Sequence, residues 1–199
     1  MTPAIVVATT NPGKVREIQA LLDGAPVRLL TLADFPGLPE PEETGATFAE
    51  NAALKAHAYA AMTGLPTVAE DSGLEIDALG GEPGIHSARY PGDAYPDRFA
   101  NLYARLAHAP RPWTARFVCE LAFVEGGAVR FTARGTVEGE IAPEARGTAG
   151  FGYDPIFFYP PYEQTLGEVT GVRKLAIVHR GHAFRAFKAW LDKGGISRG

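Results

Sequence analysis

Apolar residues along the chain follow two periodicities, one typical of strands and one of helices. Residues 4–8 are continuously apolar and rich in β-branched side chains, which predicts a strand buried on both faces. After a polar turn, residues 15–22 repeat their apolar positions with a helical period, and Gly24 ends the repeat. Within the turn, Asn11 is a good helix cap and Pro12 suits the first helical position. The chain is therefore predicted to begin with a strand, a tight turn and a helix.

The same periodicities predict the elements of the remaining chain. They are strands at residues 27–32 and 156–159, helices at residues 47–62 and 95–108, a hairpin at residues 113–141, and a last helix around residues 184–191. A capping box, Thr47 to Glu50, opens the first of these helices, and the hairpin turns at Gly126-Gly127. We interpret the hairpin as part of a smaller lobe or as a dimer surface. No repeat or linker interrupts the 199 residues, so they fit one globular domain.

The stretch from Val68 to Tyr90 carries the densest chemistry. An apolar run ends in two adjacent carboxylates, Glu70 and Asp71, and Ser72-Gly73 separates it from a second strand-like run at residues 74–79. Acids at a strand end, beside a turn that exposes backbone N–H groups, suit a hydrated divalent cation together with an anion. A hairpin with a polar tip explains the same stretch equally well.

Composition narrows the functional classes. The formal net charge is −4, so a nucleic-acid groove built on bulk positive charge is not expected. We find no apolar segment long enough to span a bilayer and no basic signal-peptide start, so no membrane partner is expected. Cys119 is the single cysteine and has no zinc-ligand spacing around it, so we expect a buried thiol. A reducing, cytoplasmic setting is the default expectation.

Other polar residues are candidates for ligand binding. Lys14 lies in the first turn of the predicted first helix, where the backbone N–H groups and the helix dipole favour anions. Glu40, Glu42 and Glu43 are available as metal ligands, although a solvated acidic loop is the simpler interpretation. Lys55 shares one side of the second helix with Asn51, and such a pair is usually only solvated.

The last third of the chain holds candidates for recognising a base. The glycine-rich loop at residues 147–155 contains Phe151 and Tyr153. Glycines beside exposed aromatic rings suit the face of a nucleobase, and a packed aromatic turn is an equally good interpretation. Lys174 and Arg180 are donor-only side chains that suit carbonyl or phosphate acceptors, unless they are merely basic residues on a helix surface.

Five stretches spread over nearly the whole chain carry a family resemblance. They are ATTNPGKVREIQALL, EETGATFAENAALKAHA, EDSGLEIDALGGEPGIHSARY, GFGYDPIFF and KLAIVHRGHA. In this order they resemble the inosine/xanthosine triphosphate pyrophosphatase family, also called Ham1-like or RdgB-like proteins. The resemblance implies an elongated α/β fold, with a mixed sheet flanked by helices and two lobes around a central active-site cleft. It also implies a homodimer that needs Mg²⁺ and cleaves ITP, dITP and XTP to the nucleoside monophosphate and pyrophosphate, which cleanses the nucleotide pool.

The resemblance also implies roles for individual residues. Asp71 matches the catalytic acid and a metal ligand, Glu43 matches the second metal ligand, and Ser72 matches a substrate contact. The other implied substrate-binding residues are Thr9, Thr10, Asn11, Pro12, Gly13, Lys14 and Lys55 for the phosphates, and Phe151, Gly152, Tyr153, Asp154, Lys174, His179 and Arg180 for the base.

Base selection has a simple hydrogen-bond logic. Inosine and xanthosine carry a 6-oxo acceptor, which Lys174 or Arg180 can satisfy, whereas adenine presents a 6-amino donor at that place. Three positions depart from the family pattern, and none of them is Asp71. Thr10 stands where many members have glycine, Glu70 where aspartate is commoner, and Val178 where serine usually precedes His-Arg.

Two alternative functions remain open at this stage. One is a Maf-type pyrophosphatase that acts on other modified nucleotides, and the other is a non-catalytic nucleotide-binding module. The Phe-Gly-Tyr-Asp and His-Arg motifs argue against the first. The presence of Asp71, Glu43 and Lys14 argues against the second.

Overall fold

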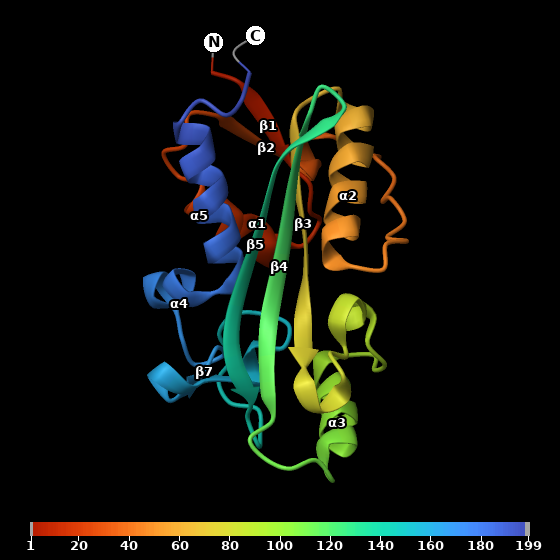
Figure 1. Ribbon diagram of the computed structural model, residues 1–199, viewed down its shortest axis with the longest axis vertical. Coiled ribbons are helices and arrows are strands. Elements are labelled where there is room, and N and C mark those ends of the chain that lie inside the picture. Colours follow the sequence, from red (N-terminus) through yellow and green to blue (C-terminus); the bar gives the residue numbers. More distant parts are fainter. Residues whose placement is uncertain (1, 198–199) are drawn as a thin grey trace. The chain divides into compact units, whose positions relative to one another are not determined.

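The computed structural model describes residues 2–197 and shows a mixed sheet with helices packed against it (Figure 1). The strand order is β2-β1-β3-β4-β5-β6-β7, with β1 parallel to β2 and β3, and β6 antiparallel to β5 and β7. The strands are β1 (Ala4–Val7), β2 (Arg28–Thr31), β3 (Thr67–Ile76), β4 (Thr114–Glu125), β5 (Ala128–Ile141), β6 (Phe157–Tyr159) and β7 (Gln164–Thr165). The helices are α1 (Pro12–Leu21), α2 (Phe48–Thr63), α3 (Tyr95–Leu106), α4 (Gly171–Ile177) and α5 (His179–Asp192). The predicted α/β class, with a mixed sheet flanked by helices, is confirmed.

The chain divides into two compact units. The first unit contains the described residues up to Asp71, Cys119–Gly135, and the described residues from His179 onward; the second contains Ser72–Val118 and Thr136–Val178. β4 and β5 occupy the range predicted for a hairpin. The single-domain organisation, the cleft and the hairpin's role in a lobe or dimer stay predictions. None of the described helices is long and apolar enough to cross a membrane.

Side chains in the first unit alternate between two apolar clusters, one on each face of the sheet. Val68 of β3 packs in a cluster with Ile18 of α1 and Phe187 of α5. Its neighbour Ala69 packs in a separate cluster with Ala56 of α2. Successive residues of a strand point to opposite faces, so α1 and α5 cover one face and α2 covers the other. Figure 1 shows α1 and α5 close together on the side away from α2.

Local capping explains where α1 and α2 begin. The Asn11 carboxamide oxygen accepts hydrogen bonds from the backbone N–H groups of Gly13 (2.8 Å) and Lys14 (3.2 Å), as predicted for a cap. Thr47 caps α2 by accepting from the N–H of Glu50 at 3.1 Å. The predicted capping box is only half formed, because the Glu50 carboxylate accepts from the Ala46 N–H at 2.7 Å instead of from the cap residue itself.

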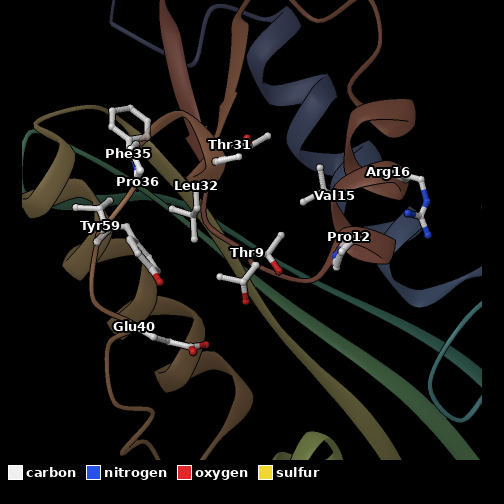
Figure 2. A pocket seen from close by; sticks show the side chains of 14 residues that line it. Thr9, Pro12, Val15, Arg16, Thr31, Leu32, Phe35, Pro36, Glu40 and Tyr59 are labelled. Carbon is white, nitrogen blue, oxygen red and sulfur yellow. The ribbon is translucent and has the colours of Figure 1, made fainter.

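A cavity of about 650 Å³ lies in the first unit beside the turn that precedes α1 (Figure 2). Of the residues predicted for the phosphate-binding turn, Thr9, Thr10 and Pro12 line it. Most of the other lining side chains are apolar, and Leu32 and Tyr59 are examples. The lining also holds two residues of opposite charge, Arg16 and Glu40, so the cavity is mainly apolar with a few polar groups (Figure 2).

The predicted break at Ser72-Gly73 is wrong. β3 runs without interruption from Thr67 to Ile76, so Asp71 lies inside a strand and not at its end. The flanking apolar positions explain this, because Val68 and Ile76 fall on the same two-residue period and a continuous strand keeps both of them buried. The turn comes later, where residues 77–79 form a 3₁₀ turn closed by Gly80, whose φ of 66° suits glycine.

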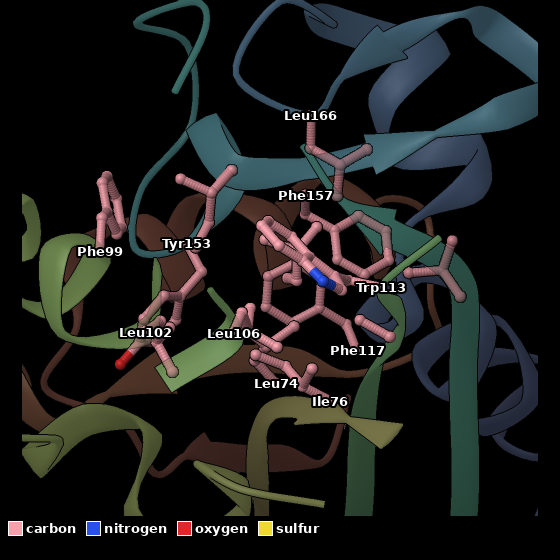
Figure 3. Close-up of a cluster of buried hydrophobic side chains, with 14 of the residues drawn as sticks. Leu74, Ile76, Phe99, Leu102, Leu106, Trp113, Phe117, Tyr153, Phe157 and Leu166 are labelled. Atoms are coloured by element: carbon pink, nitrogen blue, oxygen red, sulfur yellow. The ribbon is translucent and has the colours of Figure 1, made fainter. Parts of the chain in front are cut away.

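The second unit has its own aromatic core, shown in Figure 3. Leu102 and Leu106, on the predicted apolar face of α3, are fully buried in it. Phe117 of β4 packs against Phe157 of β6, with ring centroids 4.7 Å apart. This core holds the strand-to-turn region at residues 150–157, which carries several of the predicted base-binding residues.

Candidate active site

The two adjacent acids of β3 point to opposite faces of the sheet. Glu70 faces α1 and α5, where its carboxylate meets Lys14 and Arg180. Asp71 faces α2, where it meets Asn51 and Lys55. The strand geometry requires this separation, so the two carboxylates cannot act as one ligand pair. Only Asp71 shares its side of the sheet with the acidic loop before α2.

Asp71 lies in a compact cluster with a lysine and a second acid. Lys55 places its Nζ 3.3 Å from Asp71 Oδ1 and 2.7 Å from Glu43 Oε1. Asn51 donates from its carboxamide nitrogen to Asp71 Oδ2 at 3.2 Å. Glu42 is exposed, so Glu43 is the acid of this loop that the fold brings to Asp71. Glu43 and Asp71 are 28 residues apart in the sequence, and both contact the ammonium group of Lys55 on α2.

Burial and neighbouring charges set the protonation of this cluster. Burial raises the pKa of the Asp71 carboxyl, and the carboxylates of Glu43 and Glu70 add to the rise, while the Lys55 ammonium opposes it. Burial acts to lower the pKa of Lys55, but the surrounding carboxylates outweigh it and raise that pKa. Lys55 therefore stays charged, and Asp71 is a stronger base than an exposed aspartate.

On the opposite face, Glu70 is the centre of a buried ion network. Its Oε1 lies 2.6 Å from Lys14 Nζ and 3.5 Å from Arg180 Nη2, and the Cys119 thiol donates to its Oε2 at 3.4 Å. Arg180 also donates to Glu17 at 2.5 Å. Burial acts to raise the pKa of Glu70, but the two cations hold it well below its ordinary value. Cys119 is buried as predicted, and the pKa of its thiol is raised by that burial.

Arg180 is 1% exposed, and its guanidinium is bound by two carboxylates. The sequence alone predicted a contact between this side chain and a base. Burial among acids favours a different task, which is to hold Glu70 and, through it, Lys14. His179 is also buried, at the first position of α5.

In the second unit, three predicted base-binding residues meet around one carboxylate. Lys174 donates to Asp154 Oδ2 at 2.6 Å, and the backbone N–H of Phe151 donates to the same oxygen at 2.8 Å. The Lys174 Nζ lies 5.7 Å from the centroid of the Phe151 ring. Gly150 has a φ of +80°, and a Cβ there would overlap both Asp154 Oδ2 and Lys174 Nζ. A glycine is therefore needed for the loop to close over the ion pair.

Of the two interpretations of the glycine-rich loop, the packed aromatic turn is the one that describes Tyr153. It is 3% exposed, and its hydroxyl donates to the Ser87 carbonyl at 2.8 Å. Its ring packs edge-on against Tyr95 with centroids 5.3 Å apart. Tyr153 therefore belongs to a packed aromatic turn, whereas Phe151 in the same loop is half-buried.

The predicted phosphate turn has fewer open N–H groups than its position suggested. The side chain of Asn11 already accepts from the first N–H groups of α1, and Thr9 Oγ1 accepts from the Asn11 N–H at 3.3 Å. An anion at this turn would therefore meet the Lys14 ammonium and the hydroxyl of exposed Thr10. Ser72 follows Asp71 directly on β3 and is partly buried.

A sequence model described as the Ham1 family matches residues 5–190. The chain belongs to the Ham1 family. It is 48% identical to the dITP/XTP pyrophosphatase of Geobacter sulfurreducens over 195 residues, which is 96% of this chain and 98% of that protein. It is 47% identical to the dITP/XTP pyrophosphatase of Exiguobacterium sibiricum over 190 residues, or 94% and 96% of the two chains. A solved HAM1 protein from Coxiella burnetii aligns with a TM-score of 0.89 at 40% identity, covering 96% of this chain and 99% of that one.

The donor set of this Ham1-family chain fits a hard divalent cation. Asp71 and Glu43 offer carboxylate oxygens, and Lys55 between them shows that this place favours positive charge. The described residues contain no group of three or more His, Cys, Asp or Glu side chains that could hold a metal ion. Two carboxylates completed by water and substrate phosphates are typical of Mg²⁺, which seldom has an all-protein cage.

Sequence reasoning missed the contacts of two residues at this Ham1-family site. Asn51 was interpreted as solvated, yet it is buried against Asp71. Glu70 was paired with Asp71 as an acid that suits a cation, yet it binds Lys14 of α1 and Arg180 of α5 on the opposite face of the sheet. A polar residue on a helix can be assigned to the site from sequence only when it is known which face of that helix packs against the catalytic strand. For Asn51, its position one turn before Lys55 was the available clue.

Proposed function

We propose that this protein hydrolyses the non-standard purine nucleoside triphosphates ITP, dITP and XTP to the nucleoside monophosphate and pyrophosphate. Relatives that are 47–48% identical over nearly the whole chain carry the name dITP/XTP pyrophosphatase. The observation that carries the proposal is the cluster of Asp71, Glu43 and Lys55. In this cluster the Asp71 carboxylate, whose pKa is raised, lies beside a position between two carboxylates that favours a cation. Neither the Maf-type alternative nor the binding module is favoured by any observation, and neither is proposed.

The first unit supplies groups that suit the triphosphate and the attacking water. Asp71 would orient the water and accept its proton at a carboxylate oxygen, which its raised pKa favours. Lys14 and Lys55 would neutralise phosphate oxygens. Asp71 and Glu43 would hold Mg²⁺, which when bound spreads the charge that develops on the leaving pyrophosphate.

The second unit supplies groups that suit the base. The Phe151 ring offers a stacking face, and Lys174 offers N–H donors for a 6-oxo acceptor. Asp154 holds Lys174 in place at 2.6 Å. Contacts of Ser72, His179 and Arg180 with the substrate stay predictions, as do the homodimer and the cytoplasmic location.

The function is tested by steady-state hydrolysis of ITP, XTP, dITP, GTP, ATP and modified pyrimidine triphosphates. We expect pyrophosphate as the product, and kcat/KM for ITP and XTP above that for ATP by at least one to two decades, the effect of roughly one mispaired donor. Release of orthophosphate, or a preference for modified pyrimidines, would show a different enzyme.

Activity is expected to require Mg²⁺ or another hard divalent ion. The candidate ligands are carboxylate oxygens, so Mn²⁺ should replace Mg²⁺ while zinc should not be needed. The measurement is ITP turnover after dialysis against chelator, with each ion added back separately. Full turnover in excess chelator would contradict the proposed role of Asp71 and Glu43.

Gly150→Ala is expected to weaken ITP binding, because its Cβ would force Asp154 and Lys174 apart. We expect KM for ITP to rise about tenfold or more, the usual consequence of one lost charged hydrogen bond. Gly80→Ala is the matched control, since its φ of +66° carries the same backbone strain while nothing lies near the added Cβ. Equal KM values in the two variants would mean that Lys174 and Asp154 do not contact the base.

A further inference from the structure

Asn51 is the most buried polar residue around Asp71, at 1% exposure. Its carboxamide makes two hydrogen bonds of opposite sense. The carbonyl oxygen accepts from the Gly45 backbone N–H at 2.8 Å, and the nitrogen donates to Asp71 Oδ2 at 3.2 Å. Because one partner is a donor and the other an acceptor, the amide has a single satisfying orientation. Asn51 thus connects β3 with the loop that precedes α2.

That loop carries Glu43, two residues before Gly45. It is attached to α2 at a second point, where the Ala46 N–H donates to Glu50. Gly45 approaches Asn51 so closely that a Cβ on it would lie 2.7 Å from Asn51 Oδ1. This approach leaves no room for a side chain at position 45, so the loop is held at a fixed distance from the helix.

The Asn51 contact also differentiates the two oxygens of Asp71. Oδ2 is bound by the amide, while Oδ1 lies 3.3 Å from Lys55, whose ammonium also contacts Glu43. The oxygen on the side of Glu43 is therefore the one that faces the place for cations. Rotation of the carboxylate about its Cβ–Cγ bond would exchange these environments, and the Asn51 hydrogen bond opposes that rotation.

We infer that Asn51 is a positioning residue, which fixes the orientation of Asp71 and holds the Glu43 loop beside it for hydrolysis. The inference rests on the proposed function. An amide is required here because it donates to one partner and accepts from the other. An aspartate at position 51 would still accept from Gly45, but it would place a second carboxylate against Asp71 Oδ2.

Asn51→Asp separates the two hydrogen bonds experimentally. We expect kcat for ITP at saturating Mg²⁺ to fall roughly ten- to a hundredfold, the effect of one lost hydrogen bond to a charged group, with KM changed less than about threefold. Binding of Mn²⁺ without nucleotide, followed by electron paramagnetic resonance, should be unchanged or tighter, because another carboxylate oxygen joins the cluster. A merely structural defect would not lower turnover and preserve metal binding together.

Gly45→Ala tests the same device from the loop side. Its Cβ should push Asn51 away, so that kcat falls as in Asn51→Asp while Mn²⁺ binding weakens, because Glu43 is displaced. Thr44→Ala, at the exposed neighbouring position of the loop, is the control and should match wild type in both assays. Asn101→Asp, on α3 of the second unit, controls for the added charge.

The outcomes separate this inference from the proposed function. If wild-type protein does not hydrolyse ITP, the proposed function is wrong. If wild type is active and Asn51→Asp keeps at least half its kcat, the positioning role is wrong. Parallel loss of kcat, Mn²⁺ binding and melting temperature in Asn51→Asp would also overturn it, since this pattern marks a residue needed only for folding.

Discussion

Replacement of Asp71 by asparagine is expected to lower kcat for ITP by a factor of roughly 10² to 10⁴, the usual contribution of a general base. Asparagine keeps the shape of the side chain but removes its charge and its basicity. The amide oxygen can still accept from Asn51, so the contact to α2 survives. Near wild-type turnover at saturating Mg²⁺ would show that another group activates the water.

The same substitution should not destabilise the protein. Folding raises the pKa of Asp71, chiefly because the carboxyl is buried. A carboxyl whose pKa is raised on folding binds protons more tightly in the folded state, so its ionisation costs stability. That cost is fully present above the folded pKa and absent below the unfolded pKa. The neutral amide of the variant carries no such cost, so the melting temperature of Asp71→Asn at pH 7 should equal or exceed that of wild type.

Urea unfolding of both proteins between pH 4 and pH 8 measures this effect. The wild-type free energy of unfolding should decrease as the pH rises through the folded pKa of Asp71. The variant has no carboxyl at this position, so its free energy of unfolding should not show this decrease. A variant much less stable than wild type at pH 7 would mean that the Asp71 carboxylate is a net stabilising partner of Lys55.

Local signals explain which parts of the fold were predictable. The start of α1 follows from Asn11 and Pro12, and the start of α2 from Thr47, because each depends on contacts within four residues. The break predicted at Ser72-Gly73 failed because turn propensity is weak beside the burial of both flanking runs. Where local propensity and burial disagreed, burial decided the structure.

The site was predictable as a set of residues but not as a set of contacts. Asp71, Glu43 and Lys55 were identified from motifs, and the fold does bring them together. Asn51 connects to Asp71 because one particular side of α2 faces β3. A single sequence does not show directly which side of a helix faces a given strand. Arg180 is more distant still, since its partner Glu17 lies 163 positions earlier in the chain.

Arg180→Ala is expected to lower the free energy of unfolding by roughly 3–5 kcal/mol, the usual effect of removing one member of a buried ion pair. Arg180 is almost fully buried, and its loss removes one of the two cations that form ion pairs with Glu70 in the described part of the chain, the other being Lys14. Urea unfolding measures the change. The double variant Arg180→Ala/Glu70→Gln also removes the buried negative charge, so it should recover part of the lost stability.

The activity of Arg180→Ala distinguishes a base contact from a buried support. If Arg180 acts through Glu70, its loss lets Lys14 shift, and kcat/KM for ITP and ATP should fall together with their ratio changed less than about threefold, because triphosphate binding does not depend on the base. If Arg180 donates directly to a 6-oxo group, the ITP/ATP ratio should drop roughly ten- to a hundredfold. Glu17→Gln sharpens the comparison, since it weakens the hold on Arg180 without removing the guanidinium. A selective loss of ITP hydrolysis in Arg180→Ala would place this arginine on the base, and the buried network would then be only one of its conformations.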